Sequence, residues 1–146
     1  MMDLDRMKHS LAVANKMVKI GKEDHLSDEK LEELFLLGLV HDIGYRFGDN
    51  DNHSQIGGEI LKKSGYLYWA EVFNHGQPDC EYTSYYLDIL NSADNMIDRY
   101  GNDVGFDNRA EDIKSRYGEN SIQYQNCIKI INKLTSKEEN NHENRN

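Results

Sequence analysis

Four histidines and two aspartates, spread along the chain, are candidates for binding a metal ion. All are imidazoles or carboxylates, the groups that bind zinc, manganese, iron and related divalent metals: His9, His41, Asp42, His53, His75 and Asp94. His41 and Asp42 are adjacent, and they directly follow the apolar run 36–40 (LLGLV). Neither side chain suits the end of a buried helix unless a partner satisfies it. Because two adjacent ligands can bind one ion together, the sequence predicts a metal site here.

Asp94 supports this prediction because it interrupts an apolar helix face. The residues that share this face are Leu87, Leu90, Ala93 and Ile97. A buried carboxylate costs several kcal/mol unless it is paired or coordinated. We interpret Asp94 as a metal ligand; the alternative is a buried salt bridge to Arg99 or Arg109.

The elements that must position these residues are expected to be helices. The chain contains a single proline and no long alternating run of Val, Ile or Thr, which favours an all-α fold. Each ligand candidate falls on or at the end of an expected helix. These helices span residues 5–20, 27–41, 53–63, 66–75, 85–100, 108–117 and 121–134.

The length of 146 residues corresponds to one domain. We place this domain at residues 1–135. Residues 136–146 carry no apolar side chain, so we expect a disordered polar tail there.

The net charge is −9, with 17 Lys and Arg against 26 Asp and Glu. This balance argues against a nucleic-acid groove or an anionic membrane surface as the partner. It does not argue against a small anionic substrate, because bound divalent ions can reverse the sign of a site. Cys80 and Cys127 form no metal or redox motif. With no signal-like leader and no apolar run of membrane length, we expect a cytoplasmic protein.

The six ligand candidates occur along the chain in the order His, His-Asp, His, His, Asp. This order resembles that of the HD superfamily of metal-dependent phosphohydrolases. The resemblance covers about residues 7–118, and the HD dipeptide alone would be weak evidence for it. The stretches that carry it are 9–11 (HSL), 36–44 (LLGLVHDIG), 53–61 (HSQIGGEIL), 73–75 (FNH), 90–94 (LNSAD) and 104–118.

The resemblance implies a compact helical HD-domain fold with a metal site between the helices. His9, His41, Asp42 and Asp94 would hold a first metal, and Asp42, as the catalytic carboxylate, would bridge to a second one bound by His53 and His75. The cofactor would be one or two divalent ions of Fe, Mn, Co, Zn, Ni or Mg. The activity would be hydrolysis of a small phosphorylated substrate, with a nucleotide as the leading candidate. No serine or cysteine nucleophile is evident beside a histidine base.

The chain departs from the family pattern after the HD pair. Many of these phosphohydrolases carry a lysine there, whereas Tyr45 and Arg46 follow in this chain. Arg46 could bind the substrate phosphate in bidentate geometry, or it could be a solvent-exposed loop residue. Arg109 is a further anion-binding candidate, although a salt bridge to Glu111 or Asp112 is favoured for it.

Two alternatives to the hydrolase stay open. The first is a di-iron oxygenase on the same scaffold, and the second is a non-catalytic helical module that binds metal. The oligomeric state is also open: the tyrosine-rich run 82–86 could form a homodimer interface or simply begin a helix.

Overall fold

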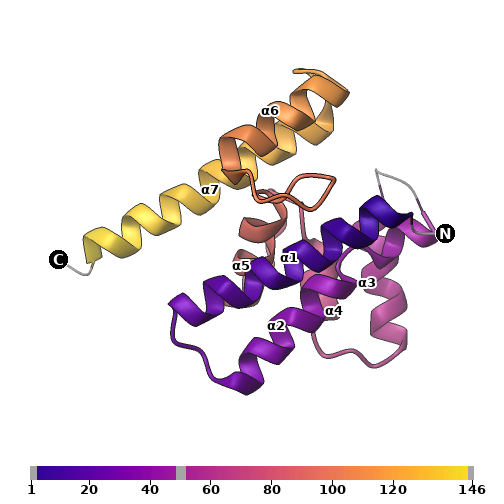
Figure 1. The fold of residues 1–146 in the computed structure, drawn as a ribbon, viewed down its shortest axis with the longest axis vertical. Coiled ribbons are helices and arrows are strands. Elements are labelled where there is room, and N and C mark those ends of the chain that lie inside the picture. The colour runs from indigo at the N-terminus through magenta and orange to yellow at the C-terminus, as the bar shows by residue number, and fades with distance from the viewer. Residues whose placement is uncertain (1–2, 49–51, 145–146) are drawn as a thin grey trace.

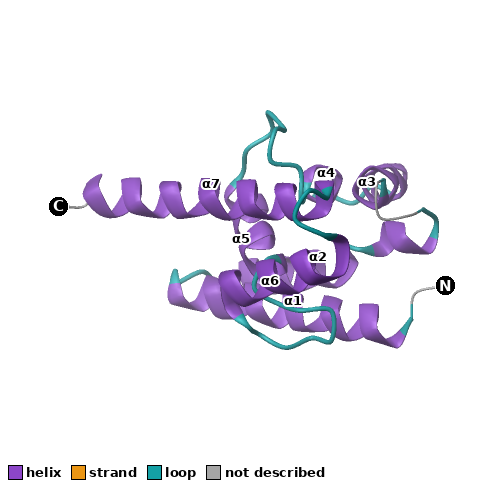
Figure 2. Cartoon of the chain, turned by 90° about the horizontal axis from the view of Figure 1, so that it is seen from above, coloured by secondary structure: helices purple, strands orange, loops and turns teal. Residues whose placement is uncertain are grey.

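The computed structural model describes residues 3–48 and 52–144, and the regular elements of this part of the chain are helices joined by loops (Figures 1 and 2). Residues 49–51, expected to belong to a loop, lie outside the described residues. The elements are α1 (Leu4–Glu23), α2 (Asp28–Val40), the 3₁₀ helix η1 (Ile43–Arg46), α3 (His53–Lys63), α4 (Trp69–Asn74), α5 (Tyr85–Asp94), α6 (Gly105–Tyr117) and α7 (Ile122–Asn144). Within the described ranges the only β pairing is an isolated bridge between Ile97 and Asp103. The expected all-α fold is confirmed.

Helices α1 and α2 form an antiparallel pair that carries the first ligand candidates (Figure 1). Asp3 caps α1 by accepting a hydrogen bond from the Arg6 N–H, and Ser27 caps α2 in the same way through the Lys30 N–H. The two helices approach closely at Gly38, where a Cβ atom would lie 2.5 Å from the Ala14 Cα. This close packing fixes the end of α2 against the middle of α1.

The main core lies between α1, α2, α4 and α5. Its members are apolar side chains that are at most 3% exposed: Val13, Met17, Leu34, Leu37, Val72, Ile89, Leu90, Ala93 and Ile97. Burial of this apolar surface is the dominant favourable contribution to folding. It holds the ends of these helices at one place in the molecule.

Helices α6 and α7 form a hairpin with a small core of their own. Ala110, Ile113 and Cys127 are buried between them. Figure 1 shows α6 and α7 side by side on one side of the other helices, and α7 extends beyond α6 towards the C-terminus. Helix α7 packs on α5, and the Lys16–Asp103 ion pair, at 2.8 Å, ties α1 to the segment that leads into α6.

The observed α5 ends at Asp94, whereas the sequence predicted a helix that continues to residue 100. After Asn95 the chain turns, because both the Tyr100 and Asn102 N–H groups donate to Asp98 Oδ1 at 2.9 Å. Gly101, with φ of 90°, completes this turn. The earlier end leaves the Asp94 carboxylate at a helix terminus.

The observed α7 continues to Asn144, whereas we expected the helix to end at residue 134 and a disordered tail to follow. Residues 145 and 146 of that expected tail lie outside the described residues. The expectation rested on the absence of apolar side chains after Thr135. That absence does not end a helix, since the Lys and Glu residues there have good helix propensity. In addition, Lys137 Nζ lies 3.1 Å from Asp88 Oδ1 on α5, which attaches this turn of α7 to the body.

We predict that Gly38→Ala destabilises the fold. At an exposed helix position this change would stabilise a protein by about 1 kcal/mol, but here the new methyl group would overlap the Ala14 backbone. We expect the free energy of unfolding to fall by about 1–3 kcal/mol, measured by urea denaturation. Glu32→Ala, on the exposed face of the same helix, is the matched control. A Gly38→Ala variant as stable as the wild type would show that the two helices can separate freely.

Candidate metal centre

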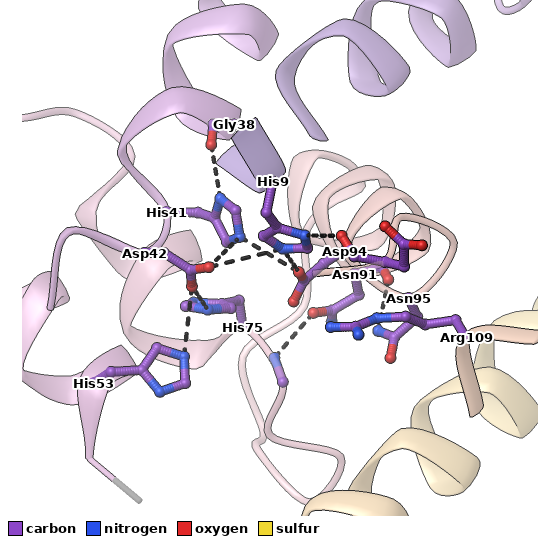
Figure 3. Close-up of polar contacts among 12 residues, drawn as sticks. His9, Gly38, His41, Asp42, His53, His75, Asn91, Asp94, Asn95 and Arg109 are labelled. Carbon is purple, nitrogen blue, oxygen red and sulfur yellow. Dashed lines mark hydrogen bonds and ion pairs between the residues drawn. The ribbon is translucent and has the colours of Figure 1, made fainter. Parts of the chain in front are cut away.

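The six predicted ligands converge at one place, although they come from separate elements (Figure 3). His9 lies in α1, His41 and Asp42 lie between α2 and η1, His53 begins α3, His75 follows α4, and Asp94 ends α5. Their ligand atoms form two groups, and within each group all atoms lie within 4.8 Å of one another. Atoms about 2.1 Å from one ion on opposite sides are about 4.2 Å apart, so each group has nearly the spacing of a metal site.

The first group contains two histidines and two carboxylates. His9 Nε2 lies 2.8 Å from Asp94 Oδ1 and 3.7 Å from Asp42 Oδ2. His41 Nε2 lies 3.2 Å from Asp42 Oδ2 and 3.4 Å from Asp94 Oδ1. Four donors therefore face one small volume.

The second group shares Asp42 with the first. His53 Nε2 and His75 Nε2 lie 3.5 Å and 3.3 Å from Asp42 Oδ1. The two oxygens of a single carboxylate thus face different pairs of histidines. This is the geometry required of a carboxylate that bridges two ions, and it matches the grouping implied by the family resemblance. Metal occupancy itself stays a prediction.

Backbone carbonyl groups set the tautomers of three of the histidines. The Nδ1 atoms of His41, His75 and His9 donate to carbonyl oxygens at 2.6, 2.6 and 2.9 Å. Each Nε2 then faces the cluster, which is the orientation that metal-binding histidines usually have. Within the described residues, the buried Nε2 atoms of His41 and His75 have no hydrogen-bond partner. The donor set therefore fits a divalent ion.

Burial and mutual charge shift the pKa values inside the cluster. Burial acts to lower the pKa of His41, but the carboxylates of Asp42 and Asp94 outweigh it and raise that pKa well above 6.5. Burial acts to raise the pKa of each carboxyl, but the imidazoles around them hold both values well below 3.8. A metal ion would displace the proton from His41, so metal affinity should rise with pH.

The alternative interpretation of Asp94, a buried salt bridge to an arginine, is not what the structure shows. Its ion-pair partners within residues 3–48 and 52–144 are His9 and His41. Arg109 instead pairs with Asp112, with Nη1 and Oδ2 3.3 Å apart, as favoured from the sequence.

Sequence reasoning missed the groups that support His53. Tyr45 stacks on the His53 ring with centroids 4.0 Å apart, and the Arg6 guanidinium carbon lies 3.3 Å from the Tyr45 centroid. Gly44 permits the close approach of η1 to α3, because a Cβ atom there would lie 1.8 Å from the His53 carbonyl oxygen. Gly44 and Tyr45, which follow Asp42 by two and three residues, were visible signals in the sequence. Arg6 lies far from them along the chain and gave no such signal.

A cavity of about 1020 Å³ opens beside the cluster. His9, Asp42, His53, His75 and Asp94 line it. Arg6 and Tyr45, which stack beside His53, line the cavity on the side of this cluster. Residues of α6 and α7 form the opposite wall. A cavity of this size accommodates a small-molecule ligand rather than a single ion.

Arg46 lies apart from this cavity. It is exposed on η1, and its guanidinium carbon lies 5.6 Å from the centroid of the Phe47 ring. The structure does not include it among the residues that line the cavity, which agrees with the solvent-exposed alternative. The substrate-binding role that we expected for Arg46 stays a prediction without support from the geometry.

Comparison with known families identifies the class of protein that this fold and site define. The HD domain family matches residues 6–137, and the chain belongs to this family. The match contains all six ligand candidates and extends two residues past the expected domain end at residue 135. No curated protein and no solved structure matched the chain. Among the described helices, none is both long enough and apolar enough to cross a membrane.

We predict that the two groups of ligands differ in their response to mutation. His53→Ala should reduce bound metal from two ions to one, because it removes a ligand of the second group only. Asp42→Ala should remove most metal from both groups, since its two oxygens face both. The measurement is elemental mass spectrometry of protein reconstituted with manganese, iron, cobalt or zinc.

The matched control for these variants is His25→Asn, which removes an exposed histidine outside the cluster. His25 has φ of 61°, a conformation that asparagine tolerates. Two ions retained in His53→Ala would exclude His53 from the site. No metal bound by the wild type under any of these conditions would mean that the cluster is structural.

The metal-free protein should lose stability as pH rises above 6.5. The raised pKa of His41 contributes stability that is fully present below 6.5 and is lost as pH rises through the folded-state value. The lowered pKa values of Asp42 and Asp94 contribute stability that is present above 3.8 and is lost at lower pH. The melting temperature of chelator-treated protein should therefore be highest between these limits.

His41→Asn is the control for this pH profile, because it lacks the titrating imidazole and should show a weaker decline above pH 6.5. Added metal should restore stability at high pH by replacing the proton on His41. A metal-free melting temperature that rises from pH 6.5 upwards would contradict the assigned charge state.

Proposed function

We propose that this protein is a metal-dependent phosphohydrolase that cleaves a phosphoester or phosphoanhydride of a small molecule, with a nucleotide as the leading candidate. The observation that carries the proposal is the shared carboxylate: Asp42 Oδ2 faces His9 and His41, while Asp42 Oδ1 faces His53 and His75. Membership of the HD domain family supports the same class of reaction.

The residues of the chain prepare the site for this chemistry. When bound, divalent ions lower the pKa of coordinated water towards about 7 and neutralise phosphoryl oxygens. The backbone carbonyls that accept from His41 and His75 keep both rings oriented with Nε2 towards Asp42. Asp42 and Asp94 supply negative charge that favours cations, and their low pKa values keep them ionised at neutral pH.

The cavity supports a small phosphorylated substrate. Arg6 and Tyr45 line it close to the second ligand group, so a guanidinium and an aromatic ring lie on the same side as His53. An arginine can bind phosphoryl oxygens in a planar, two-point manner. Phe73 and Tyr117 add apolar surface suited to the body of such a molecule, including a nucleobase.

A cysteine nucleophile is the competing mechanism within the same cavity. Cys127 lines the cavity, but burial raises the pKa of its thiol to about 11. A thiol with this pKa is protonated at neutral pH and is a poor nucleophile. Cys80 also lines the cavity, and its Sγ donates to the Tyr82 carbonyl oxygen at 3.5 Å. We therefore assign the chemistry to water activated by divalent ions that the histidine and aspartate groups would hold.

The test is hydrolysis of p-nitrophenyl phosphate, bis(p-nitrophenyl) phosphate and nucleoside phosphates by protein loaded with manganese, iron, cobalt, zinc, nickel or magnesium. We expect turnover that a chelator abolishes. Asp42→Asn should lower kcat by about a hundredfold or more, because loss of a ligand should exceed the 10–100-fold cost of losing an outer partner. Cys127→Ala should keep its activity.

Three results would count against the proposal. Activity lost in Cys127→Ala but kept in Asp42→Asn would assign the chemistry to the thiol. Oxygen uptake that depends on iron, without phosphate release, would favour the oxygenase alternative. Tight metal binding with no turnover on any phosphoester would favour the non-catalytic module.

A further inference from the structure

Arginine is concentrated around the cavity in this acidic protein. Four of the six arginines in the chain line the cavity, and they are Arg6, Arg99, Arg109 and Arg116. None of the eleven lysines, all of which lie in the described part of the chain, lines it. A need for positive charge alone would not distinguish the two residue types. Arginine differs from lysine in its planar fork of donors, which matches the oxygens of phosphate groups.

Two of these arginines lie on one face of α6 and share a single carboxylate. Arg109, Asp112 and Arg116 are three and four residues apart, the spacing that places side chains on the same helix face. Arg109 Nη1 lies 3.3 Å from Asp112 Oδ2, and Arg116 Nε lies 3.8 Å from the same oxygen. One negative charge therefore faces two positive charges.

These arginines are only partly satisfied by the protein. The side chains of Arg109 and Arg116 are 12% and 25% exposed. Within the described residues, the buried Nε atom of each has no hydrogen-bond partner. A charged group removed from water in this way is costly unless a partner compensates it.

Asp98 is the other carboxylate that responds to the charge of Arg109. Burial acts to raise its pKa, but hydrogen bonds from Asn102 and Tyr100 and the charge of Arg109 lower it overall. The Asp98 oxygens are already engaged by the turn that follows α5. Among the described residues Asp98 makes no ion pair with Arg109, so Asp112 is the carboxylate in direct contact with both α6 arginines.

The α6 arginines and the metal centre face the same space. Arg109, Arg116, Asp42 and Asp94 all line the one cavity of about 1020 Å³. Figure 3 shows the Arg109 side chain pointing from its helix towards the side of the cluster formed by Asp94. A single small molecule can therefore contact the ligand groups at one end and the α6 wall at the other.

We propose that Arg109 and Arg116 form a second anion-binding subsite, and that the substrate is a small molecule with two phosphate groups. One phosphate lies at the histidine and aspartate cluster and is the one cleaved, while the other is bound by the α6 arginines and is not cleaved. The inference rests on the proposed function, because that function places the first phosphate.

The experiment measures binding without turnover. The probes are alkanediyl bisphosphonates and alkyl monophosphonates of the same chain length, whose C–P bonds resist hydrolysis. Isothermal titration calorimetry with manganese-loaded protein gives the affinity for each. We expect the wild type to bind the best bisphosphonate at least about tenfold more tightly than its monophosphonate, as one further charge-assisted contact implies.

Arg109→Gln and Arg116→Gln should each weaken bisphosphonate binding by about tenfold and leave monophosphonate binding nearly unchanged. Arg116→Gln is the safer variant for folding because its side chain is the more exposed, and metal content and melting temperature check both variants. Lys129→Gln is the matched control: it removes the same charge from an exposed position on α7 that does not line the cavity.

Several results would overturn the inference. These are equal affinities of the wild type for the two probes, equal weakening by Lys129→Gln, and arginine variants that weaken the monophosphonate as much as the bisphosphonate. Failure of the proposed function is distinguishable from these. It would appear as an absence of phosphoester hydrolysis by a protein that still prefers bisphosphonates through Arg109 and Arg116.

Discussion

A single buried carboxylate, surrounded by four imidazoles, is the constraint on which the structure depends. Asp42 is removed from water, and the histidine rings that face its two oxygens come from α1, from the end of α2, from α3 and from the end of α4. Leaving such a group uncompensated would cost several kcal/mol. The helix ends that carry these histidines must therefore meet around Asp42. The packing that brings these helix ends together also forms the candidate metal site.

The packing achieves this through small residues and backbone groups. Gly38 lets α2 approach α1, and Gly44 lets η1 approach the start of α3. The carbonyl of Gly38 also accepts the hydrogen bond that orients His41. The same glycine therefore serves helix packing and ring orientation, so fold and site cannot be optimised separately at this position.

The all-helical fold could be predicted from apolar spacing. The convergence of the six ligand candidates could be predicted because their order along the chain resembles that of the HD family, whereas His53 or His75 taken alone carries little signal. A carboxylate on an apolar face, such as Asp94, signals a partner without naming it. The turn after α5 was not predicted, because the apolar spacing that continues to Ile97 favoured a longer helix. The hydrogen bonds that form the turn are local: Asp98 Oδ1 accepts from the N–H groups of Tyr100 and Asn102, two and four residues later. Arg109 was recognised in the sequence as an anion-binding candidate, but no local pattern shows that it lines one cavity with Arg6 and Arg116.

The hairpin of α6 and α7 has a core separate from the one that positions the ligand candidates. One wall of the cavity thus belongs to a unit whose packing does not involve His41 or Asp42. Substitutions in that hairpin can reshape this wall of the cavity while the histidine and aspartate cluster stays in place. A scaffold divided in this way lets one helical hairpin vary the shape and charge of the cavity while the apolar side chains of the main core stay unchanged.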